Sequence, residues 1–162
     1  MDNITIFAAK YLILGVVLVA GMVWLSCRGT KRTELTMTII AAGVVAVILT
    51  KLAGKLYYHP RPFVVQNITP LISHAADNGF PSEHTVLAMT LTSTLYYYRR
   101  GLAGLALILT LLVGWGRVAA HVHSWIDIAG GLVIGAAAGV FGYWLTKKFS
   151  RRPAAPSPTA KP

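Results

Sequence analysis

Long apolar runs constrain this chain more than any other feature. Five of them can be separated along the sequence, and they cover Ile4–Cys27, Leu35–Leu52, Thr85–Tyr98, Leu102–Trp115 and Ile126–Leu145. A bilayer core about 30 Å thick needs roughly 20 residues of helix, so the third and fourth runs must extend into their polar neighbours. Such extension is tolerated where polar groups line a protein cavity. We therefore predict an all-α integral membrane protein, a bundle of about five transmembrane helices.

The composition agrees with a membrane location. The chain is 55% hydrophobic and only 12% charged, whereas a soluble domain carries about a quarter charged residues. Its formal charge of +10 could indicate a nucleic-acid binder, but the basic residues lie between apolar runs and form no continuous stripe. We predict membrane lipids as partners and no nucleic acid. The oligomeric state stays open.

The 162 residues leave room for one domain. We place a single membrane-embedded domain at residues 1–150. The segment 151–162 is rich in Pro, Ala and Ser and predicts a disordered cytoplasmic tail. In the fifth run, Gly131, Gly135 and Gly139 recur every fourth residue, which favours close helix packing within the monomer and only weakly indicates a dimer.

The distribution of charge predicts an orientation. Basic residues follow the first, third and fifth runs, at 28–32, 99–100 and 147–161. With five spans these segments share one side, which the positive-inside rule assigns to the cytoplasm. All five histidines lie in or beside the two connections on the other side: His59, His74, His84, His121 and His123. We predict an active site at the outer face, because ionisable groups at a membrane are functional by default.

The second outward connection offers a nucleophile. His123 and Asp127 are four residues apart, so on a helix they would lie on one face and could touch. A carboxylate that accepts a hydrogen bond from one imidazole nitrogen makes the other nitrogen a better nucleophile. Such a pair is common and often only structural. Arg117, six residues before His123, can add positive charge nearby.

The first outward connection offers groups that suit phosphate. Arg61 lies between two prolines on a stiffened backbone, and its planar fork suits bidentate contact, with headgroup anchoring as the alternative. Ser82 is positioned to cap the third helix, whose free N–H groups form a natural phosphate site. The alternative for Ser82 is a cap with no catalytic part. His84, at the start of that helix, is a candidate general acid.

This inventory fits phosphoryl transfer through an enzyme nucleophile, with cationic groups stabilising the phosphoryl oxygens. His121 and His123 could bind a metal, but no carboxylate-rich cluster joins them. We therefore predict no metal and no other cofactor. A serine nucleophile is less favoured, because Ser82 lies in no Gly-x-Ser-x-Gly turn.

The motifs resemble those of the type-2 phosphatidic acid phosphatase superfamily. The resemblance covers roughly Lys51–Asp127 and consists of an ordered set: Arg61-Pro62, then Pro81-Ser82-x-His84, then Arg117-(five)-His123-(three)-Asp127. Within the superfamily, the segments Pro-Arg-Pro-Phe-Val, His-Ala-Ala-Asp and Phe-Pro-Ser-Glu-His-Thr are most similar to bacterial undecaprenyl pyrophosphate phosphatases of the bacitracin-resistance type. Those enzymes resemble this chain in having an acidic residue where Glu83 stands.

The resemblance implies a role for each matching residue. His123 would be the nucleophile, oriented by Asp127, and His84 would protonate the leaving group. The phosphate would be held without a metal by Arg61, Arg117 and Ser82. In the superfamily a lysine stands seven residues before the motif arginine, and in this chain that position is Gly54. Lys55, one residue further on, is the expected phosphate contact, with Lys51 as the alternative.

The function implied is hydrolysis of undecaprenyl pyrophosphate to the monophosphate, through a phosphohistidine, in the bacterial cytoplasmic membrane. The motif residues would contact the phosphate and not the lipid tail. Hydrolysis of phosphatidic acid, phosphatidylglycerol phosphate or a lipid A phosphate by the same chemistry therefore stays an alternative. A non-catalytic lipid-binding protein is a further alternative. A transporter or channel is less favoured, because it would need ionisable groups through the membrane depth.

Overall fold

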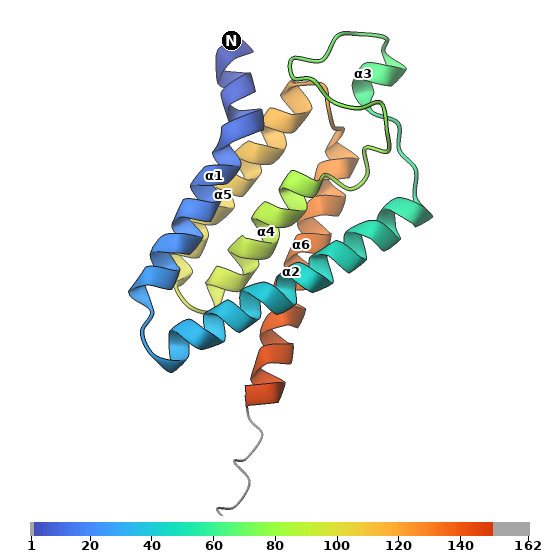
Figure 1. The fold of residues 1–162 in the computed structure, drawn as a ribbon. Coiled ribbons are helices and arrows are strands. Elements are labelled where there is room, and N and C mark those ends of the chain that lie inside the picture. Colours follow the sequence, from blue (N-terminus) through green and yellow to red (C-terminus); the bar gives the residue numbers. More distant parts are fainter. Residues whose placement is uncertain (1, 151–162) are drawn as a thin grey trace, which may run out of the picture.

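The computed structural model describes residues 2–150, which form a helical bundle (Figure 1). Its helices are α1 (Asp2–Ser26), α2 (Thr30–Leu56), the single-turn α3 (Pro62–Val65), α4 (Glu83–Tyr96), α5 (Arg100–Ala119) and α6 (Trp125–Ser150). Within the described residues there is no strand, only an isolated bridge between Pro60 and Asn78. The all-α prediction is confirmed, and each predicted apolar run corresponds to one long helix. The predicted tail, 151–162, lies outside the described residues.

The central helix is shorter than its neighbours. Four helices, α1, α2, α5 and α6, are long and apolar enough to cross a membrane. The fifth, α4, has 14 residues and measures about 21 Å at 1.5 Å per residue, well below a bilayer core of about 30 Å. It packs against all four of the others, and Figure 1 shows that it begins below the upper ends of α1 and α5.

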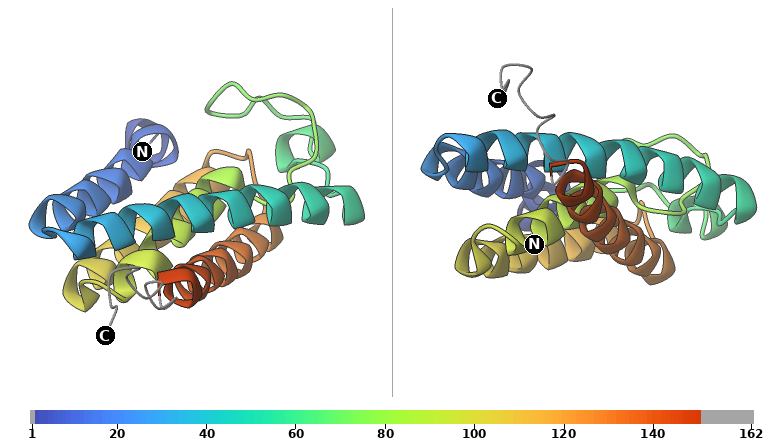
Figure 2. Two further views of the ribbon diagram at one scale, coloured as in Figure 1. Left: turned by 60° about the horizontal axis from the view of Figure 1, so that its bottom comes forward. Right: turned by 90° about the horizontal axis from the view of Figure 1, so that it is seen from below.

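Small residues let the helices approach closely. Gly131, Gly135 and Gly139 of α6 face α4, and a Cβ at Gly135 would lie 2.6 Å from the carbonyl oxygen of Val86. The predicted packing role within the chain is therefore confirmed. On the same helix, a Cβ at Gly142 would lie 2.6 Å from the backbone nitrogen of Ala42 in α2. Figure 2 shows how α2 crosses over α4 and α6.

The outer surface of the bundle is apolar. Large hydrophobic side chains are exposed on the long helices, for example Leu18 on α1 and Val133 on α6, at 68% and 69%. Inside, Val16, Leu35 and Leu95 are fully buried in one core cluster. An apolar exterior around a packed interior is the arrangement that a lipid environment stabilises.

The two ends of the bundle differ in chemistry. One end carries the start of α1, α3 and the long connection between α2 and α4, and the other carries the tight turns α1–α2 and α4–α5 together with the end of α6 (Figure 1). The five histidines gather at the first end, and the basic segments at 28–32 and 99–100 lie at the second. The predicted separation is present, and which end faces outward stays a prediction.

Candidate active site

The start of α6 fixes the carboxylate of Asp127. Ser124, just before the helix, donates its backbone N–H to Asp127 Oδ2 at 2.7 Å, and the Asp127 N–H donates to Ser124 Oγ at 3.4 Å. This reciprocal pair is a capping box. His123 therefore precedes the helix, and the prediction that His123 and Asp127 share one helical face is wrong. The two side chains still meet, since His123 Nδ1 lies 3.6 Å from Asp127 Oδ2.

A backbone carbonyl sets the tautomer of His123. Its Nδ1 lies 3.0 Å from the carbonyl oxygen of Gly79, closer than it lies to Asp127. A carbonyl can only accept, so Nδ1 carries the hydrogen and Nε2 keeps its lone pair. Nε2 lies 3.3 Å from Arg61 Nη1 and 3.5 Å from Arg117 Nη2. The free nitrogen of this buried ring therefore points between two guanidinium groups.

Hydrogen bonds to Asp77 and to two backbone carbonyls fix the side chain of Arg61, so that its guanidinium group faces His123. Its Nε donates to Asp77 Oδ1 at 2.7 Å, its Nη1 to the carbonyl of Val122 at 2.8 Å, and its Nη2 to the carbonyl of Asn78 at 3.3 Å. Burial raises the pKa of Asp77, but the hydrogen bond and charge of Arg61 outweigh this effect and leave the pKa lowered. Asp77 is therefore an anionic anchor for Arg61.

Arg117 reaches the same point from α5. Its side chain is buried, Nη1 donates to the carbonyl of Ala9 at 3.4 Å, and Nε has no hydrogen-bond partner within the described structure. Buried guanidinium groups with unused donors require an anion. Two of them converge on one histidine nitrogen, so the arrangement can accommodate a phosphate-like oxyanion.

Two further histidines face this charge. Burial, together with the positive charge of Arg117, lowers the pKa of His84 to about 4. Burial also lowers the pKa of His74, with Arg61 and Arg117 adding to the effect. The ring of His74 lies edge-on to that of His123, with 6.0 Å between centroids. A bound phosphate would offset the positive charges and favour protonation of both rings.

These groups line one cavity of about 530 Å³. It includes the predicted residues Arg61, Arg117, His84, His123 and Lys55. Lys51 lines it as well, so the cavity admits either lysine as a phosphate contact. Asp127 is completely buried behind His123.

Ser82 occupies the N-cap position of α4, as predicted, but makes no side-chain cap. It is fully buried, accepts a hydrogen bond from Thr85 Oγ1 at 3.1 Å and does not line the cavity. Its backbone N–H donates to the carbonyl of Asp127 at 3.1 Å. The geometry therefore links Ser82 to the position of α6, and the predicted contact with phosphate stays a prediction.

Sequence reasoning missed two residues that organise the site. His59 Nδ1 lies 3.0 Å from Asp127 Oδ1, so the carboxylate is shared between two histidines. Asn78 accepts from the N–H groups of His59 and Phe80 and donates to the carbonyls of Gly54 and Tyr57, at 2.8–3.0 Å. Nothing in the spacing of these residues signals such contacts, because they depend on how the long connection folds back over α2.

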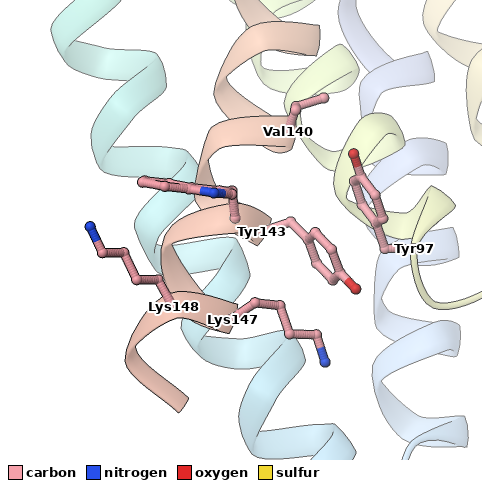
Figure 3. Close-up of a pocket in the computed structure, with 6 residues that line it drawn as sticks. Tyr97, Val140, Tyr143, Lys147 and Lys148 are labelled. Carbon is pink, nitrogen blue, oxygen red and sulfur yellow. The ribbon is translucent and has the colours of Figure 1, made fainter. Parts of the chain in front are cut away.

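A second pocket, of about 540 Å³, lies at the basic end (Figure 3). Tyr97 and Tyr143 stack there with centroids 3.8 Å apart, and Lys147 pairs with Glu34 at 2.8 Å. No histidine lines it. Aromatic rings beside lysines are typical of the membrane–water interface. The histidine cavity is therefore the better candidate for the active site.

A buried histidine beside two guanidinium groups, within an apolar bundle, is an arrangement that suits a membrane-embedded phosphatase. Residues 31–151 match the family model of the PAP2 superfamily, and the chain belongs to this superfamily.

Two relatives cover most of the chain. The bacitracin transport permease protein BcrC of Bacillus licheniformis is 32% identical over 151 residues, which are 93% of this chain and 74% of that protein. Undecaprenyl-diphosphatase BcrC of Bacillus subtilis (strain 168) is 31% identical over 134 residues, 83% of this chain and 69% of that protein.

The fold matches a solved structure of the same class. The crystal structure of a transmembrane PAP2 type phosphatidylglycerolphosphate phosphatase from Bacillus subtilis aligns with a TM-score of 0.58 at 19% identity, over 93% of this chain and 77% of that one. At that identity the likeness concerns the fold. Together with the family, it makes this chain a membrane protein and a lipid phosphatase of the PAP2 type.

Proposed function

We infer that the chain removes the terminal phosphate of undecaprenyl pyrophosphate through a phosphohistidine on His123, with residues 1–150 as the catalytic unit. The observation that carries the mechanism is the orientation of His123. Its Nδ1–H donates a hydrogen bond to the carbonyl oxygen of Gly79, and its Nε2 points between Arg61 and Arg117. The substrate follows from the relative in Bacillus subtilis that is named an undecaprenyl-diphosphatase.

The first step is an in-line displacement. Nε2 attacks the terminal phosphorus, the bond from that phosphorus to the bridging oxygen breaks, and the lipid monophosphate leaves. Arg61 and Arg117 stabilise the charge on the phosphoryl oxygens. His84 gives a proton to the leaving oxygen, and Asp127 stabilises the positive charge that builds up on the ring of His123.

The second step returns the enzyme to its starting state. A water molecule attacks the phosphohistidine, neutral His84 takes the proton of that water, and the P–N bond breaks to release inorganic phosphate. One water is consumed in the two steps and no redox chemistry occurs. The mechanism uses no metal, so activity should survive a chelator.

The decisive experiment measures phosphate release by the purified protein in detergent with EDTA. Undecaprenyl pyrophosphate is compared with phosphatidic acid and phosphatidylglycerol phosphate, and His123→Ala runs beside the wild type. We expect EDTA-resistant release that prefers the pyrophosphate and vanishes in the variant. Preference for a glycerolipid would retain the mechanism but contradict the substrate, and no release from any of them would indicate a non-catalytic lipid-binding protein.

A trapping experiment tests the intermediate separately. Substrate labelled with ³²P on the terminal phosphate is mixed with enzyme and quenched in alkali within one turnover. We expect a label on the protein that is stable to base and labile to acid, and that is absent from His123→Ala. Turnover without any trapped label in the wild type, even after the second step is slowed by cooling, would favour direct attack by water.

A further inference from the structure

His59 does not line the active-site cavity, but it contacts the carboxylate that faces the nucleophile. Its Nδ1 lies 3.0 Å from Asp127 Oδ1, and its side chain is 27% exposed while that of Asp127 is completely buried. We propose that His59 is a positioning residue for the reaction, which acts through Asp127 on His123. This inference rests on the proposed function, because it concerns the step that forms the phosphohistidine.

The contact determines which nitrogen of His59 carries the hydrogen. Asp127 accepts the backbone N–H of Ser124 at 2.7 Å, and a hydrogen bond of this kind favours the ionised carboxylate. An ionised carboxylate can only accept, so Nδ1 of His59 is the donor. The hydroxyl oxygen of Ser124 lies 3.3 Å from the same nitrogen and can accept as a second, longer contact.

The two oxygens of Asp127 have separate partners. Oδ1 accepts from His59, while Oδ2 accepts from the N–H of Ser124 and lies 3.6 Å from Nδ1 of His123. A rotation of the carboxylate would break both hydrogen bonds at once, so the two donors together keep Oδ2 toward the nucleophile. The attraction between charges weakens with distance. A carboxylate that moved away would therefore stabilise the cationic ring of His123 less.

The backbone of His59 contacts the other group on which the nucleophile depends. Its carbonyl accepts from the N–H of Gly79 at 2.8 Å, and the carbonyl of Gly79 accepts from His123 Nδ1 at 3.0 Å. The N–H of His59 donates to the side chain of Asn78 at 2.9 Å. A substitution of the side chain leaves these peptide groups in place. The contact with Asp127 can therefore be removed while the carbonyl that sets the tautomer of His123 is retained.

Three variants separate the hydrogen bond of His59 from its packing. The ring of Tyr57 stacks on that of His59, with 5.9 Å between centroids and 12° between planes. His59→Phe keeps a ring for this stack and removes the donor, whereas His59→Asn offers an amide N–H in its place. The matched control is His121→Asn. His121 is exposed, does not line the cavity and has a φ of 61°, which asparagine tolerates.

We expect His59→Phe to lower kcat on undecaprenyl pyrophosphate about 10-fold with little change in KM, because the charge on His123 builds up only in the transition state. His59→Asn should recover most of the loss, and His121→Asn should match the wild type. A rise in KM without a fall in kcat would overturn the proposal, and so would a loss in His59→Asn as large as that in His59→Phe.

A double-mutant cycle distinguishes this role from a structural one. In Asp127→Asn the charge is already lost, so the addition of His59→Phe should lower kcat by less than about twofold. Thermal unfolding midpoints, measured beside the kinetics, should stay close to that of His121→Asn. Losses that multiply in the double variant would show that His59 does not act through Asp127. A loss of kcat that follows a lower midpoint would indicate a structural role, and either result would overturn the proposal.

A spectroscopic measurement makes the test independent of the substrate. Long-range ¹H–¹⁵N spectra of protein labelled in histidine report which ring nitrogen carries the hydrogen, and the signals that disappear in His59→Asn assign His59. We expect the hydrogen on Nδ1 of His59, and a change of this tautomer in Asp127→Asn, whose amide can donate to Nδ1. The signals of His121 should not change.

A hydrogen on Nε2 of His59 in the wild type, or no response to Asp127→Asn, would overturn the positioning role while leaving the proposed function intact. Conversely, if the protein hydrolysed another lipid or none, the spectra would still show the expected tautomers. The two hypotheses can therefore fail separately.

Discussion

At the scale of single residues, the nucleophile is controlled by two acceptors with different tasks. The carbonyl of Gly79, 3.0 Å from His123 Nδ1, fixes where the hydrogen lies. Asp127, at 3.6 Å, is held by its own capping box and by His59, and supplies negative charge. In a site where the carboxylate alone set the tautomer, its loss would reverse the ring's protonation. Here the backbone keeps the tautomer in place.

We therefore predict a moderate effect of Asp127→Asn. The amide oxygen can still accept from Ser124, and His123 keeps its hydrogen on Nδ1, so only the charge is lost. We expect kcat to fall roughly 10- to 100-fold, well short of the ~10⁴-fold loss that a reversed tautomer causes. Steady-state kinetics beside a thermal unfolding curve will measure this, and a loss as complete as that of His123→Ala would show that the carbonyl does not hold the tautomer.

The protonation of His84 should depend on whether phosphate is bound. Burial and positive neighbours lower its pKa to about 4 in the free protein, and bound phosphate raises the pKa by opposing those charges. A general acid works below its pKa. The limb that falls as pH rises should therefore lie at higher pH in the profile of kcat than in that of kcat/KM, since the first reports the complex and the second the free enzyme.

His84→Gln is the control for this pH profile, because the substrate's own titration persists in the variant. The separation between the two limbs should disappear in His84→Gln. If the wild-type limbs coincide, or the variant retains their separation, His84 is not the group that titrates.

The residue types of the site could be read from the sequence, and their geometry could not. The sequence predicted that His84, His123 and the two arginines share one site, because all four lie in or beside the two outward connections and within the ordered motifs. The contact of His123 with the carbonyl of Gly79 could not be predicted, since every residue carries a backbone acceptor. The hydrogen bonds of the Asn78 side chain could not be predicted either, since they depend on how the long connection folds. Ser82 is buried and does not line the cavity, so its expected contact with phosphate stays a prediction.

At the scale of elements, the packing of α4 against α6 depends on the glycine stripe. A Cβ at Gly135 would lie 2.6 Å from the carbonyl oxygen of Val86 and 2.9 Å from the backbone nitrogen of Thr90. These atoms belong to the backbone of α4 and cannot rotate away. The helix that begins with the catalytic motif is thus positioned by the absence of side chains on its neighbour.

Gly135→Ala should therefore destabilise the protein by about 1–3 kcal/mol, as overpacking does. Gly21→Ala on α1, where an added Cβ meets nothing within 4 Å, should raise stability by up to about 1 kcal/mol, because alanine is the better helix former. Thermal unfolding in detergent will compare them. Equal midpoints for the two variants would contradict the close packing of α4 and α6.

Helix positions were well predicted, while the depth of α4 was not. The apolar runs marked every long helix because hydrophobic length is what a bilayer selects. The third run looked short in the sequence, and extension into the motif was expected to lengthen it. In the structure α4 adds only Glu83 and His84 at its start and ends at Tyr96, and it packs against the other four bundle helices.

At the scale of the whole molecule, the separation of the histidine end from the basic end predicts an orientation. The positive-inside rule predicts a cytoplasmic basic end and an active site outside. The start of α1 lies at the active-site end (Figure 1), so we expect it to be outside as well.

Single cysteines introduced into a Cys27→Ala background will test this orientation. Gln66→Cys, exposed in the long connection, should react with a membrane-impermeant maleimide in intact spheroplasts. Thr30→Cys, exposed at the α1–α2 turn, should react only after the membrane is opened. The reverse pattern would place the active site in the cytoplasm.

The recessed start of α4 has a consequence for water. A bilayer core is dry, yet the proposed reaction consumes a water molecule at every turnover. Because α4 begins below the upper ends of α1 and α5, and a cavity of about 530 Å³ opens at its start, we expect solvent to reach a depth that lipid alone would keep anhydrous. The bundle would then act as a local thinning of the membrane, where a lipid phosphate meets water while its tail stays in hydrocarbon.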